Sequence, residues 1–169
     1  MPYVDTQTIH NPATGTAIPA AWGDQTRDNS EFLIDPPFAS VSHSATQVSV
    51  NGVGLALLAN TELFDNNAMH STVTNTSRIT IQTAGRYKVA ATVEFATDAD
   101  GDRRLVFRVN GTTTHQSLRV SSSASTVILT GTRDLVLAAT DYVEVVATQS
   151  AGNNLDVTLH EFSAMFVTR

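Results

Sequence analysis

Alternation of apolar and polar residues is the strongest pattern in this chain, and it begins near residue 38. The clearest example is 87–95, where the odd positions hold Tyr, Val, Ala, Val and Phe and the even positions hold Lys, Ala, Thr and Glu. A period of two gives a strand one buried face and one solvated face. The pattern therefore predicts a series of strands. The alternation recurs in 105–109, 135–139, 143–147 and 155–159.

Turn signals separate the predicted strands. They are dipeptides that contain Gly, a residue that favours tight turns, and no helical period lies between them. Short strands at this spacing predict an all-β sandwich or jelly roll. The dipeptides are Ala84-Gly85, Asp100-Gly101, Asn110-Gly111, Gly131-Thr132 and Gly152-Asn153.

Two segments are apolar on both faces. Residues 55–59 read Leu-Ala-Leu-Leu-Ala, and the last predicted strand changes phase after residue 159. A central strand or a bulge would explain either segment. Alternatively, the second face packs against another subunit. The candidate subunit-interface residues are Leu55, Leu57, Phe162 and Phe166.

Residues 1–37 differ from residues 38–169 and are predicted to form an N-terminal arm. The arm holds all five prolines and shows no period of two. Its one helical candidate runs from Ala20 to Leu33, after Pro19 and before Pro36. A helix this short is marginal alone, so its apolar side chains need a partner surface. The candidate docking residues are Trp22, Phe32 and Leu33.

Composition excludes several kinds of protein. The net charge of −6 argues against binding to a phosphate backbone, so no nucleic acid partner is expected. The absence of Cys excludes disulfides, thiolate metal sites and Cys nucleophiles. No apolar stretch is long enough for membrane insertion, and no cleaved export signal is recognisable, so we expect assembly in a cytoplasm.

One acidic cluster could bind a metal ion. Asp98, Asp100 and Asp102 alternate around Gly101, and carboxylates at this spacing can wrap Ca²⁺. No Glu follows at the position where an EF-hand loop would need one. A solvated hairpin loop explains the same residues, because Asp and Gly are ordinary turn residues. Calcium is the one cofactor that the sequence suggests.

No catalytic pattern stands out, so we predict that the protein is not an enzyme. The five histidines lack metal-ligand spacing, and no Gly-x-Ser-x-Gly sequence occurs. Surface recognition remains, with the predicted loops 112–116, 121–126 and 149–154 as candidates. Arg119, Arg133 and Tyr142 are the side chains best suited to anchor a glycan or a protein.

Four runs of the sequence resemble the C1q/TNF-like family. Residues 77–89 are similar to its strand, Gly turn and aromatic residue, and 105–111 to its apolar strand that ends in Asn-Gly. Residues 135–145 match its Leu, Gly-Asp and Val segment, except that Thr140 stands where Gly is usual. Residues 160–166 resemble its closing aromatic strand. The resemblance implies a homotrimeric jelly roll of about ten antiparallel strands over 38–169.

Residues 8–37 resemble the start of small tail proteins of tailed bacteriophages. This resemblance implies a virion component, assembled in the host cytoplasm. We expect a minor tail protein whose arm binds other virion proteins and whose jelly roll recognises a host-surface glycan or protein. Two alternatives remain open. One is a capsid decoration or head-fibre trimer, and the other is a free glycan-binding adhesin.

Overall fold

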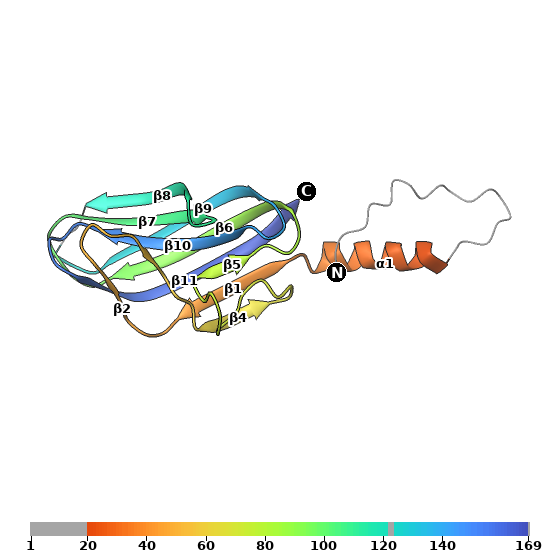
Figure 1. The fold of residues 1–169 in the computed structure, drawn as a ribbon, viewed down its shortest axis with the longest axis horizontal. Coiled ribbons are helices and arrows are strands. Elements are labelled where there is room, and N and C mark those ends of the chain that lie inside the picture. The colour runs from red at the N-terminus through yellow and green to blue at the C-terminus, as the bar shows by residue number, and fades with distance from the viewer. Residues whose placement is uncertain (1–19, 122–123, 169) are drawn as a thin grey trace.

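One α-helix and eleven β-strands form the part of the chain that this computed structural model describes, residues 20–121 and 124–168. The helix, α1 (Ala20–Ile34), lies beyond one end of two facing sheets (Figure 1). It is too short to cross a membrane, and no other described helix could. The strands are β1 (Phe38–His43), β2 (Gln47–Ser49), β3 (Leu55–Ala56), β4 (Thr61–Asp65), β5 (Arg78–Thr80), β6 (Gly85–Phe95), β7 (Asp102–Val109), β8 (Thr113–Ser121), β9 (Val127–Leu137), β10 (Tyr142–Gln149) and β11 (Leu155–Thr168).

The two sheets are antiparallel throughout the described part of the chain. Sheet A has the order β4-β1-β11-β6-β9, with β2 paired to one end of β11. Sheet B has the order β3-β10-β7-β8, with β5 paired to β10. The predicted all-β sandwich is therefore confirmed, with a single helix before it.

The core between the sheets follows the predicted alternation. Along β6, Tyr87, Val89, Ala91, Val93 and Phe95 are buried, while the residues between them point outward. β7 does the same from sheet B, because Leu105 and Phe107 are fully buried.

A bulge in β11 explains the change of phase near its start. The pairing of β11 with β6 shifts register between Val157 and Leu159. Leu155 and Val157 point inward before the shift, and Phe162 and Phe166 point inward after it. Because β11 is also a central strand, the chain itself accounts for this apolar segment.

The segment 55–59 is not a regular strand. β3 ends at Ala56, after which the Leu57 N–H donates to the Val145 carbonyl over 2.9 Å. Leu57 and Ala59 are buried, whereas Leu58 points outward and binds the side chain of Gln47 through its backbone. The second apolar face of this segment is therefore largely exposed.

The turn predictions had mixed outcomes. Asn110-Gly111 joins β7 to β8 with both residues at positive φ, as predicted. Gly131-Thr132 is not a turn. It lies inside β9, where β6 pairs with every residue of the strand and keeps it extended. Thr140 adopts φ 75°, the left-handed conformation that Gly normally provides at such a turn.

The arm and the sandwich are in contact. Helix α1 matches its predicted span to within one residue, but Phe32 is 8% exposed and meets Phe166 edge-on, with ring centroids 5.0 Å apart. The Phe166 N–H also donates to the Pro37 carbonyl. β11 thus begins at the end of the sandwich far from α1 and finishes beside α1 (Figure 1).

Candidate binding surface

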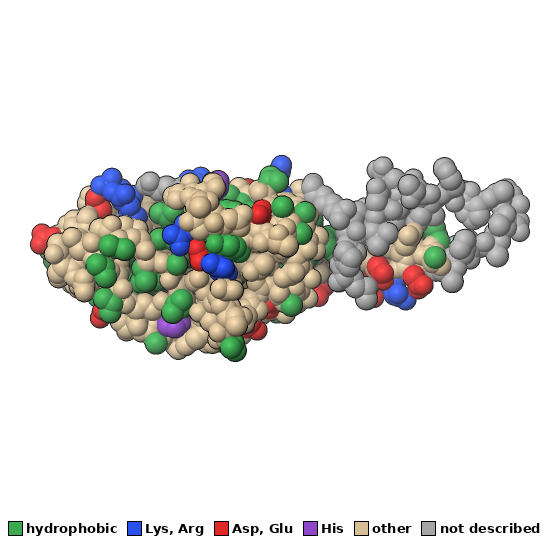
Figure 2. All heavy atoms as spheres, viewed as in Figure 1, with side chains coloured by type: hydrophobic (Ala, Val, Ile, Leu, Met, Phe, Trp, Pro, Cys, Tyr) green, Lys and Arg blue, Asp and Glu red, His purple; other side chains and the backbone are tan. Residues whose placement is uncertain are grey.

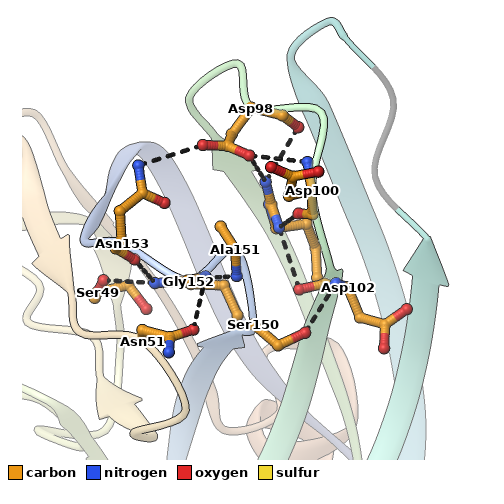
Figure 3. Close-up of polar contacts among 11 residues, drawn as sticks. Ser49, Asn51, Asp98, Asp100, Asp102, Ser150, Ala151, Gly152 and Asn153 are labelled. Carbon is orange, nitrogen blue, oxygen red and sulfur yellow. Dashed lines mark hydrogen bonds and ion pairs between the residues drawn. The ribbon is translucent and has the colours of Figure 1, made fainter.

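The distal loop cluster lies at the end of the sandwich far from α1. It consists of the loops 50–54, 96–101 and 150–154, and Figure 3 shows them side by side. Gln149 is buried among them, and its Nε2 donates to the carbonyls of Ser49 and Asn153 over 2.9 and 2.8 Å. Its Oε1 accepts from the Ala151 N–H. One buried amide therefore holds two of the three loops in place.

Arg103 is fully buried beneath the loop 96–101. Its Nη1 donates to the carbonyls of Asp100 and Asp102, at 2.9 and 3.2 Å, and its Nη2 donates to the Asp98 carbonyl at 3.2 Å. The Asp98 carboxylate lies 3.8 Å from the same nitrogen. The loop is thus folded around a guanidinium cation, whose fork matches several oxygen acceptors at once.

This arrangement contradicts the predicted calcium loop. The Asp98 carboxylate accepts from the Asp100 N–H and from Asn153, and the first of these bonds lowers the pKa of Asp98 most. The Asp102 carboxylate turns outward to Arg119. Because the carboxylates diverge, the described residues include no group of three His, Asp or Glu side chains arranged for a metal ion. Arg103 supplies the positive charge that the loop carbonyls attract.

The outer face of sheet B carries charged side chains. Glu144 on β10 is only 4% exposed and binds Arg78 from β5 and Arg108 from β7. Arg78 also lies over the ring of Tyr142, 3.9 Å from its centroid. In Figure 2, basic and acidic side chains gather over β10 and β5, and a second basic group lies toward the loop end.

Two of the three predicted recognition residues share this face. Tyr142 on β10 and Arg119 on β8 both occupy outward positions of sheet B. Arg133 lies elsewhere, on β9, beside a groove of about 580 Å³ that His115 and Leu135 also line. The sequence analysis did not select Arg78, Arg108 or Glu144, although their outward positions follow from the alternation in their strands.

The two-sheet fold of this chain matches solved structures. No protein-family model and no curated protein matches the chain. The globular domain of zebrafish complement 1qA protein superposes with a TM-score of 0.58 and 19% identity, over 79% of this chain and 98% of that one. Two crystal structures of murine APRIL superpose with a TM-score of 0.55, at 8% and 10% identity, over 77% of this chain and 99% of theirs. The chain has a C1q/TNF-like jelly-roll fold.

The outer face of sheet A differs from the rest of this C1q/TNF-like sandwich. Among the described strands, all exposed large apolar side chains belong to sheet A. A shallow hollow of about 130 Å³ at the middle of the face is lined mostly by small residues, including Ser40, Ala90 and Ser163, together with Glu161. The exposed apolar residues on its strands are Val48, Leu63, Phe64, Ile128, Val136, Met165 and Val167.

The residues predicted for a subunit interface do not lie on that face. Leu57, Phe162 and Phe166 are buried in the core of one chain, and Leu55 is half-buried against the same core. The bulge in β11 turns both phenylalanines inward. The single chain leaves their role between subunits untested, but it removes the pattern that suggested one.

The three predicted docking residues have different environments. Leu33 is 75% exposed and Trp22 is 38% exposed, so both could contact a partner. Phe32 is not available for docking, because Phe166 covers its ring. Residues 1–19 lie outside the described part of the chain, and the likeness of 8–37 to phage tail proteins has no counterpart in these comparisons.

Two histidines stack on each other between the sheets, one buried and one half-buried. His160 on β11 stacks on His43 of β1, with ring centroids 5.8 Å apart, and is 2% exposed. Burial lowers the pKa of His160 to about 4, with a further contribution from His43. Burial also lowers the pKa of His43. Both rings therefore favour the neutral form.

Proposed function

We propose that this chain is a non-enzymatic homotrimeric binding module that joins a bacteriophage virion through its N-terminal arm. Domains with the C1q/TNF-like fold are generally non-catalytic binding domains that commonly form trimers. The observation that carries the trimer is the outer face of sheet A, where exposed apolar side chains surround a centre of small residues. Such a face is suited to close packing against another protein surface.

The two ends of the molecule support a division of roles. Helix α1 extends beyond one end of the sandwich with Leu33 exposed, while the distal loop cluster lies at the other end (Figure 1). An attachment through the arm would leave the distal loop cluster directed away from the particle. The virion role itself rests on the sequence of residues 8–37.

The trimer is tested by the mass of the full chain in solution. Light scattering should give about three times the chain mass of 18.0 kDa at micromolar concentration. A monomer at that concentration would contradict the proposal.

The docking role is tested in particles. A full-length double variant, Trp22→Ser with Leu33→Ser, should keep the trimer mass but enter particles at a reduced level. Val73→Ser is the matched control, because Val73 is an exposed apolar residue that lies in the β4–β5 loop and not on α1. Equal incorporation of both variants would contradict docking through α1.

A further inference from the structure

Four arginines occupy outward positions of sheet B and are called the arginine face: Arg78, Arg104, Arg108 and Arg119. Along β7, Arg103, Leu105 and Phe107 point inward, so Arg104 and Arg108 point outward. Arg78 pairs in register with Glu144 on β10, and Arg119 pairs with Arg104. Residues four apart on one strand are separated by about 13 Å, so the cations are spread along the face.

Glu144 holds two of these guanidinium groups in fixed positions. Its Oε1 accepts from the Ser77 hydroxyl at 2.9 Å and from Arg78 Nε at 3.4 Å. Its Oε2 accepts from Nε and Nη2 of Arg108, at 3.2 and 2.9 Å. Both oxygens of the carboxylate are therefore occupied. Both terminal nitrogens of Arg78 and Nη1 of Arg108 make no hydrogen bond to Glu144 and can donate to a ligand. Donors fixed in this way lose little entropy when they bind an anion.

The arginine face has an excess of positive charge. Arg119 binds the Asp102 carboxylate, whereas Arg104 forms no hydrogen bond or ion pair with the described residues. Four guanidinium groups thus face two carboxylates, Glu144 and Asp102, on a chain whose net charge is −6. Since the rest of the protein is acidic, charge complementarity directs an anionic partner to this face.

The surroundings of the arginines indicate a saccharide. Thr80, Thr114 and Thr148 occupy outward positions between or beside them, and their hydroxyl groups can bond to sugar hydroxyls. The strands of sheet B expose no large apolar side chain in the described part, which disfavours a protein partner. Nucleic acid is disfavoured because its dense charge would meet an acidic chain with few cations.

We propose that the arginine face binds an acidic polysaccharide, with its carboxylate or sulfate groups on Arg78, Arg104 and Arg108. The inference specifies a ligand class for the binding module. It rests on the proposed function only in assuming that the chain is a binding module. It requires neither the arm nor a virion.

The test measures binding of the full chain to dextran sulfate, to polygalacturonate and to uncharged dextran, by calorimetry at low and at physiological salt. We expect binding to at least one acidic polymer, weakening with salt, and none to dextran. Arg104→Ser should weaken it about fivefold, because each exposed charge contact contributes modestly. Arg27→Ser removes the same charge from the arm and should leave affinity unchanged. The sulfated and carboxylated polymers distinguish the two anionic groups.

Three results would overturn the proposal: no binding to either acidic polymer at low salt, equal loss in both variants, or tighter binding of duplex DNA. Arg104 lacks a partner whose loss would unfold the protein, and the solution mass of each variant is measured alongside. An unchanged trimer that fails to bind would refute the arginine face alone. A monomer that still binds would refute the trimer and leave the arginine face standing.

Discussion

Sheet A and sheet B differ in the side chains that their outer faces expose and in the basic side chains that they bury. Sheet A exposes apolar side chains on its outer face and holds two stacked histidines, the buried His160 and the half-buried His43, on its inner one. Sheet B exposes arginines and buries another beneath its loops, Arg103, among carbonyl oxygens. Buried histidines avoid the cost of burial by losing their proton, whereas a guanidinium cannot and must be surrounded by acceptors. This difference is the basis for our proposals that sheet A packs against another protein surface and that sheet B binds a charged ligand.

Adding a charge to the middle of each outer face gives the sharpest test of this contrast. Ala90→Glu places a carboxylate among the small residues of sheet A, and we expect it to convert the trimer to a monomer, because an unpaired charge is costly to bury. Thr148→Glu makes the matched change on sheet B and should leave the trimer intact. Sedimentation velocity separates the two outcomes. If Ala90→Glu stays trimeric, sheet A is not the interface.

Removing the buried cation Arg103 should lower the unfolding free energy substantially. We expect this effect to be smaller than the loss of the trimer. Arg103→Met leaves three carbonyls without this donor and removes the cation beside the Asp98 carboxylate, and we expect a loss of about 3 kcal/mol in unfolding free energy. Arg119→Met breaks an exposed pair with Asp102 and should cost less than about 1 kcal/mol. Urea denaturation of both variants measures the difference. Equal losses would show that the loop does not depend on Arg103.

The buried histidines should make stability depend on pH. The folded pKa of His160, about 4, lies below its ordinary value of 6.5, so the unfolded chain binds the proton first. Stability should be highest above pH 6.5 and should fall on acidification towards pH 4, by at most about 1.4 kcal/mol per pH unit for one site. His160→Gln should reduce this slope, while His43 keeps part of it. Denaturation at several pH values checks the expectation, with His115→Gln as the control that should retain the full slope.

The local pattern of apolar and polar residues predicted much of the fold, because the alternation of a strand depends only on residues that are neighbours in the sequence. The faces of β6 and β7, the Asn110-Gly111 turn and helix α1 all follow from spacing and turn chemistry. The turn expected at Gly131 was wrong because long-range pairing with β6 overrides a local preference for bending.

The candidate surface was only partly predictable. Tyr142 and Arg119 were chosen by residue type, and they do share a face of sheet B. Calcium was predicted because Asp98, Asp100 and Asp102 are close in sequence, but only the folded loop places Arg103 among their carbonyls. Phe32 was predicted to be a docking residue, but in the folded chain Phe166 of β11 covers its ring.

The sequence by itself determined the strands, the fold class and the separate character of the arm, because hydrophobic period and turn residues act over a few positions. The tertiary structure alone decided which side chains meet. It turned Phe162 and Phe166 inward through a bulge, gathered the arginines onto one face, and placed a guanidinium in the loop where a metal ion was expected. These outcomes depend on pairing between distant strands, and the register of such pairs is fixed only when the whole core forms.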